Sequence, residues 1–187
     1  YSSDWSLEPQ AIMVGGVTAS GNTTGAVWGF DGQNWFRFSS TNGTRALPDD
    51  ADGYTVFPYF TYRTSNTNFS VTKRSTWIAI GHFTATDRRS TWSRVYTSQD
   101  NGISWIEAPV NLQLPAGMTP FYCAQAYVIP HTITDNMLRA IKPITEWDAD
   151  YVYIFGGRYF DTYDRQTKLR NQMWRAVIER MTFKPLQ

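Results

Sequence analysis

The chain has 187 residues, of which 42% are hydrophobic and 16% aromatic, and its formal net charge is +1. This composition predicts one folded domain with a substantial core and argues against disorder. The near-neutral charge argues against nucleic acid as the main partner, because phosphate binding needs a clustered excess of Lys and Arg. No stretch approaches the roughly 18 apolar residues of a membrane-spanning helix, so we expect no membrane span.

One unit of strands occurs three times along the chain. Its most recognisable part is an apolar strand that we expect to end in glycine, followed by a polar loop, an aromatic strand and a short closing strand. β-branched and aromatic residues bounded by Gly, Pro, Asn and Asp are typical of strands. In chain order the expected strands are 12–16, 26–31 and 34–40, then 56–64, 76–83, 93–100 and 103–110, then 121–130, 150–157, 172–179 and 180–186.

The spacing of the units supports a true repeat. The Leu-Pro pairs at 47–48 and 114–115 are 67 residues apart, and the strand-ending glycines Gly15 and Gly81 are 66 residues apart. The third copy, with Gly156, is longer because of its loops. We therefore place the units at about 1–45, 46–112 and 113–187. The first unit lacks an opening strand, unless residues 5–10 supply a remnant of one.

Four-stranded antiparallel units repeated along a chain are the blades of a β-propeller. Blades stack face to face, which explains strands that are apolar almost throughout. We predict an all-β, β-propeller-like fold with about three blades. Closed propellers have about four to eight blades. The chain is thus part of a longer propeller that packs against an N-terminal region, an open stack, or half of a propeller completed by self-association.

The octet SQDNGISW at 98–105 predicts a tight turn between a third and a fourth strand. Gly102 tolerates a positive φ, and the side chains of Ser98 and Asp100 can accept hydrogen bonds from the turn. Trp105 is expected to pack beneath the turn. A degenerate copy of this turn, with Asp31, Gly32 and Trp35, occurs in the first unit.

A second motif lies in the third unit. Gly156 and Gly157 predict a place where the backbone bends or approaches another segment closely. A Gly-Gly pair followed by a loop, Asn171 and Trp174 is similar to the kelch blade pattern.

These motifs carry a resemblance to a known family. The run from YVYIFGG to NQMWRAVIERMTFKPLQ, with the octet at 98–105, resembles the C-terminal region of a Bacteroides-type family of exported proteins of unknown function with kelch-like and Asp-box propeller repeats. The resemblance implies a propeller fold and an extracytoplasmic setting, either periplasmic, at the cell surface or secreted. The resemblance does not identify any catalytic residues in this chain.

Catalysis finds little support in the sequence. The octet is similar to the Asp-box of sialidases, but a turn between third and fourth strands lies on the face opposite the usual ligand site. A glycosidase needs two carboxylates about 5–10 Å apart, and no acidic pair has a diagnostic spacing. With one cysteine and two histidines in the chain, we expect no metal and no cofactor. Cys123 is expected to be a small core side chain.

Binding is the remaining function. The loops after second and fourth strands share the usual ligand face, and two of them, 83–91 and 158–170, combine aromatic and charged residues that suit sugars or protein surfaces. The candidate ligand residues are Arg88, Arg89, Arg158, Tyr159, Asp161 and Tyr163. We predict a non-catalytic module for glycan or protein recognition at the bacterial cell envelope. The alternatives are a fragment of a sialidase-like glycoside hydrolase and a purely structural or assembly domain.

Overall fold

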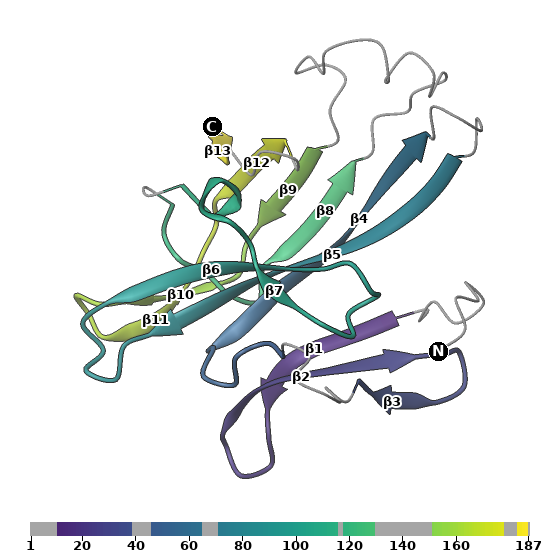
Figure 1. The fold of residues 1–187 in the computed structure, drawn as a ribbon. Coiled ribbons are helices and arrows are strands. Elements are labelled where there is room, and N and C mark those ends of the chain that lie inside the picture. The colour runs from purple at the N-terminus through teal and green to yellow at the C-terminus, as the bar shows by residue number, and fades with distance from the viewer. Residues whose placement is uncertain are drawn as a thin grey trace.

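The computed structural model describes residues 11–38, 46–64, 71–115, 118–129, 151–177 and 183–186. Within these ranges the strands form three larger antiparallel sheets that fan out along the chain, with one additional two-stranded hairpin (Figure 1). The first sheet contains β1 (Ala11–Val17), β2 (Thr23–Phe30) and β3 (Trp35–Arg37). The second contains β4 (Gly53–Thr64), β5 (Val71–Thr84), β6 (Thr91–Ser98) and β7 (Ile106–Glu107).

The third sheet contains β8 (Gln125–Ile129), β9 (Tyr151–Phe155), β12 (Met173–Val177) and β13 (Lys184–Leu186), and the hairpin is β10 (Arg158–Asp161) with β11 (Gln166–Leu169). A 3₁₀ turn, Val110–Leu112, lies between the second and third sheets. The four-stranded sheets have the orders β4-β5-β6-β7 and β13-β12-β9-β8, so each is an antiparallel meander. The predicted all-β fold with four-stranded blades is therefore confirmed. Over the described ranges, the sheets do not close into a ring.

The first sheet has the order β1-β2-β3. The suggested remnant of an opening strand, residues 5–10, lies outside the described residues.

The middle of the second sheet, around residues 78–80 of β5, is buried on both faces. Ile78 and Ile80 point to one side of β5 and join the larger core cluster. This cluster also contains Phe121, which precedes β8, and Val152 of β9. Ala79 points to the other side and joins a second cluster with side chains of the first sheet. Because strand side chains alternate between faces, burial of both faces requires a continuous apolar run. This explains the WIAIG stretch at 77–81.

Two of the strands do not end at their glycines as expected. β5 continues through Gly81 to Thr84, and β1 continues through its two glycines to Val17 with an irregularity in its pairing with β2 between Val14 and Gly16. Only β9 ends at the glycines, at Phe155. In the first two units the pairing with the neighbouring strand continues beyond the glycine. The glycine at this repeat position therefore does not mark the end of the strand in every unit.

Two further expectations need correction. Residues 158–170 were expected to be a loop, but they contain the β10–β11 hairpin. Cys123 is exposed rather than a core residue. The physical reason is that the neighbouring Phe121 enters the core and is fully buried. The chain then turns through a positive φ of 51° at Cys123, which leaves the thiol outside.

The turn at 98–105 is held by its own side chains. The Asp100 carboxylate accepts hydrogen bonds from the Ser98 hydroxyl at 2.7 Å and from the Ser104 backbone N–H at 2.9 Å. Gly102 has a φ of +88°, and its N–H donates to Ser98 Oγ at 2.8 Å. The Trp105 ring lies beneath the turn, 2% exposed, and its Nε1 donates to the Gly102 carbonyl at 3.0 Å.

The related turn in the first unit is built differently. The Asp31 carboxylate accepts hydrogen bonds from the N–H groups of Gln33 and Asn34, at 2.8 and 2.7 Å. These two bonds lower the pKa of Asp31. Gly32 has a φ of +103°. Trp35 is 50% exposed and packs on Phe30 with ring centres 5.1 Å apart, so it does not occupy a core position like that of Trp105.

Gly157 brings the hairpin against the segment that precedes β8. A Cβ at Gly157 would lie 2.9 Å from the Cβ of Ala124 and 2.9 Å from the carbonyl oxygen of Tyr122. The next residue, Arg158, exchanges two backbone hydrogen bonds of 2.9 Å with Tyr122. Trp174 packs against the larger core cluster from β12. The missing side chain at Gly157 therefore fixes where the hairpin starts.

Candidate functional site

A cavity of about 340 Å³ lies between the end of the second sheet, the β10–β11 hairpin and the segments that lead into β4 and β8. The second sheet contributes the end of β5 and the β5–β6 turn, and the hairpin contributes Phe160 and Thr167, which pair across β10 and β11. The segments leading into β4 and β8 complete the wall. The lining residues are Asp52, Thr84, Ala85, Thr86, Arg88, Tyr122, Phe160 and Thr167.

All of these segments are connections after second strands or connections that enter first strands. Antiparallel strand order places both kinds on the same face of a propeller, the face on which the sequence predicts ligand-binding loops. The octet turn at 98–105 connects β6 to β7 and therefore lies at the other end of the second sheet. The cavity and the turn are thus on opposite faces.

Asp52 is the carboxylate of the cavity. Its Oδ2 accepts hydrogen bonds from His82 Nδ1 at 2.7 Å and from Thr84 Oγ1 at 2.7 Å. His82 is fully buried and Asp52 keeps 35% of its side chain exposed, so the pair runs from the interior to the cavity wall. The backbone supports the pair, because the Asp52 N–H donates to the His82 carbonyl at 2.8 Å.

This environment keeps Asp52 ionised. Partial burial raises the pKa of Asp52. The hydrogen bonds from His82 and Thr84 and the nearby positive charge of Arg88 lower it by more than burial raises it, so the net pKa is below the usual value. A carboxylate held in this way remains a hydrogen-bond acceptor throughout the neutral range.

Aromatic rings line the other parts of the cavity. The Tyr122 ring centre lies 5.0 Å from that of His82. The Arg88 guanidinium lies 6.0 Å from the centre of the Phe160 ring. Arg88 has a φ of +55°, so the β5–β6 turn places it in a left-handed conformation from which it reaches across to the hairpin.

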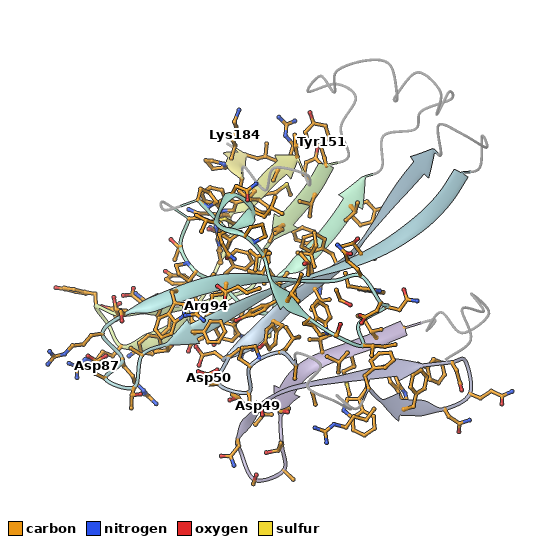
Figure 2. The ribbon with its side chains drawn as sticks, in the orientation of Figure 1. Asp49, Asp50, Asp87, Arg94, Tyr151 and Lys184 are labelled. Carbon is orange, nitrogen blue, oxygen red and sulfur yellow. The ribbon has the colours of Figure 1, made fainter. Side chains whose placement is uncertain are left out.

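The predicted residues of the β5–β6 turn separate in space. Arg88 lines the cavity. Arg89 is exposed and is not part of the lining, and its backbone N–H donates to Asp87 Oδ1 at 3.0 Å. Asp87 lies at the tip of this turn (Figure 2).

The predicted residues of the hairpin also separate. The register pairs Phe160 with Thr167, and both line the cavity. Alternation places Tyr159 and Asp161 on the opposite face of β10, and Arg158 on the Phe160 face outside the lining. Tyr163 is in the turn, 94% exposed.

Asp161 serves the hairpin itself. Its carboxylate accepts hydrogen bonds from the Tyr163 N–H at 2.9 Å and from Lys168 Nζ at 2.6 Å. The Lys168 bond, together with two turn N–H groups, lowers the pKa of Asp161. Lys168 also contacts Asp164, and these bonds close the turn of the hairpin.

The sequence interpretation missed Asp52, Thr84, Tyr122 and Phe160. The only available signal was positional: the loops after β5 and β9 fall on one predicted face, so residues at their bases should meet. Nothing in the sequence shows that Asp52 approaches His82, because 30 residues separate them. Their contact depends on the register in which Gly53 faces His82.

In the described part of the chain, no helix is long and apolar enough to cross a membrane. No group of three or more His, Cys, Asp or Glu side chains there could hold a metal ion.

The repeated four-stranded meanders, packed face to face, define a β-propeller domain. The chain belongs to the DUF6242 beta propeller domain family, which matches residues 1–186. It is therefore a β-propeller domain of unknown function. No curated protein and no solved structure matched the chain.

Proposed function

We propose that this propeller domain is a non-catalytic recognition module that binds a glycan or protein ligand at the bacterial cell envelope. The observation that carries the proposal is the cavity between the second sheet and the β10–β11 hairpin. It combines a charged donor, Arg88, a carboxylate, Asp52, and two aromatic rings on the usual ligand face of a propeller. Concave sites with a few convergent polar groups are the usual form of small-ligand sites.

Recognition explains the cavity better than catalysis does. Asp52 is the single carboxylate among the described lining residues. A glycoside hydrolase needs two. The alternative of a sialidase-like fragment would also require several arginines around one substrate carboxylate, whereas Arg88 is the one arginine of the described lining.

The experiment is a binding screen of the chain against glycans and peptides, with hydrolysis products measured in the same wells. Arg88→Ala should abolish binding of any hit. Arg165→Ala is a matched control, because Arg165 is also exposed and also has a positive φ, 54°, but lies outside the lining. Turnover of a glycan, or equal binding by the two variants, would contradict the proposal.

Assembly is a second candidate function, favoured by exposed apolar side chains on the two outer sheets. Met13 and Trp35 lie exposed on the first sheet, and Tyr127, Phe155 and Met173 on the third. Such patches mark interaction surfaces when they are contiguous. Light scattering across a concentration series tests this candidate, and a concentration-independent monomer mass would contradict self-association.

The cellular setting rests on the resemblance to an exported Bacteroides-type family. The hydrogen bonds within 98–105 support an Asp-box assignment of that turn, and the positive φ values of Gly156 and Gly157 support a kelch-like third unit. Fractionation of cells that produce the full protein tests the envelope location, and a cytoplasmic pool would contradict it.

A further inference from the structure

We propose that the cavity ligand is a neutral saccharide, and that Asp52 is the hydrogen-bond acceptor that selects it. This inference rests on the proposed recognition function and narrows it to one chemical class. It is carried by the arrangement of Asp52 and Arg88, by the rings beside them and by the volume of the cavity.

Among the described residues, the hydrogen bonds to the Asp52 side chain all go to one of its two oxygens. Oδ2 accepts the hydrogen bonds from His82 and Thr84. Among the residues that the structure describes, none donates to Oδ1. An ionised carboxylate accepts about four hydrogen bonds. The side chain therefore retains acceptor capacity at the cavity wall.

Arg88 and Asp52 face the same cavity without pairing. Asp52 feels the charge of Arg88, yet the ion pairs among the described residues join Asp52 only to His82. A hydroxyl group both donates and accepts, so neighbouring hydroxyls of one sugar can donate to Asp52 and accept from Arg88. The Asp52 carboxylate would repel an anionic ligand, and the Arg88 guanidinium would repel a cationic one. The mixed pair thus favours a neutral polyhydroxylated ligand.

The remaining walls suit the apolar faces of a sugar ring. Tyr122 and Phe160 come from two different segments and line the same space. Aromatic faces provide apolar contact area with little loss of side-chain entropy. The volume of about 340 Å³ is at the low end for ligand sites, which start at about 300 Å³. It therefore fits one or two sugar rings better than a folded protein surface.

The acceptor is held in place before any ligand arrives. His82 is fully buried and fixes Asp52 from the interior, while Thr84 fixes it from the end of β5. A binding group that is already locked loses little entropy when the ligand binds. His82 and Thr84 are therefore positioning residues for Asp52.

The test compares wild-type chain with Asp52→Asn and Asp50→Asn, titrated with methyl glycosides of neutral hexoses, with a sialoside and with short peptides. Asp50, labelled in Figure 2, is an exposed carboxylate in the same loop and is not among the lining residues, so it controls for the loss of charge. We expect a neutral hexoside to bind, Asp52→Asn to weaken it about tenfold or more, and Asp50→Asn to leave it unchanged.

The outcomes separate this inference from the proposed function. A neutral hexoside that binds equally to Asp52→Asn and wild type would overturn the inference. Binding of only the sialoside or a peptide, lost in Arg88→Ala, would overturn the inference and leave the recognition function intact. Absence of any Arg88-dependent binding would overturn both. If Asp52→Asn does not fold, Thr84→Val replaces it, because it removes one positioning hydrogen bond while keeping the side-chain shape, and we then expect a weakening of about threefold or more.

Discussion

The Arg88 guanidinium of the β5–β6 turn lies 6.0 Å from the centre of the Phe160 ring in β10. This contact joins the second sheet to the hairpin of the third unit. It also closes one side of the cavity, since both residues belong to the lining. The ligand site that we propose is thus shared between two repeats and is not a property of one blade.

Successive side chains of β10 point to opposite faces of the hairpin, so its two neighbouring aromatic residues should differ in their effect on ligand binding. Phe160 faces the cavity and Tyr159 faces away from it. Phe160→Ala should weaken ligand binding about tenfold or more, because it removes an apolar wall, and Tyr159→Ala should leave binding unchanged. Titration calorimetry of the two variants measures both effects. A stronger effect of Tyr159→Ala would place the ligand on the opposite face of the hairpin.

The neighbouring glycines of the third unit should differ in their tolerance of alanine. Gly156→Ala should cost about 1 kcal/mol of unfolding free energy, because its φ is +68° but the nearest atom to a new Cβ is 4.0 Å away. Gly157→Ala should cost about 2–4 kcal/mol, because the new Cβ would also crowd Ala124 and the backbone of Tyr122. Urea denaturation measures both values. Equal losses would mean that the hairpin moves freely relative to the segment before β8.

Two tryptophans of related turns should contribute unequally to stability. Trp105→Ala should cost about 3–5 kcal/mol, as truncation of a large buried aromatic side chain does. Trp35→Ala should cost about 1 kcal/mol, because Trp35 is half exposed and packs on the Phe30 ring. Thermal and urea unfolding of both variants measure these losses of unfolding free energy. A melting temperature for Trp105→Ala equal to wild type would rule out its core role.

Ligand binding should depend on the ionisation of Asp52. Its pKa in the folded chain lies below the usual value, which is about 3.9 in an unfolded chain. The folded carboxylate is therefore ionised above about pH 5, and its favourable contribution to binding is lost as the pH falls through the folded pKa. Binding should be constant between about pH 5 and pH 8 and weaken below about pH 4.

Thr84→Val makes this pH dependence specific. The variant removes one of the hydrogen bonds that lower the pKa of Asp52. The acid limb of the binding curve should then move to higher pH. The same titration series in wild type and variant measures the shift, and superimposable curves would mean that another group controls binding.

The fold could be predicted because its signals are local. The apolar run at 77–81 indicates a strand buried on both faces, and Asn101 and Gly102 indicate a turn, which they form with φ values of +59° and +88°. The β10–β11 hairpin escaped prediction because its composition is polar. It is a surface hairpin, with Leu169 and Tyr163 largely exposed, so it shows no core pattern.

The site could be predicted only in outline. The sequence predicted ligand residues in the connections 83–91 and 158–170, and residues of both connections line the cavity, with Arg88 among them. The contacts that give the cavity its chemistry depend on strand register and on packing between repeats. Asp52 meets His82 only because of the register of β4 against β5. Cys123 is exposed because of one positive φ beside a buried Phe121.

A chemical-shift titration of isotope-labelled chain with the tightest ligand from the screen shows most directly whether the ligand binds between the second sheet and the hairpin. We predict that amide shifts concentrate in 84–88, around Tyr122 and in 158–167, and that the amides of 98–105 on the opposite face stay unchanged. Shifts concentrated at 98–105, or on the outer face of the first sheet, would contradict a ligand site between the second sheet and the hairpin.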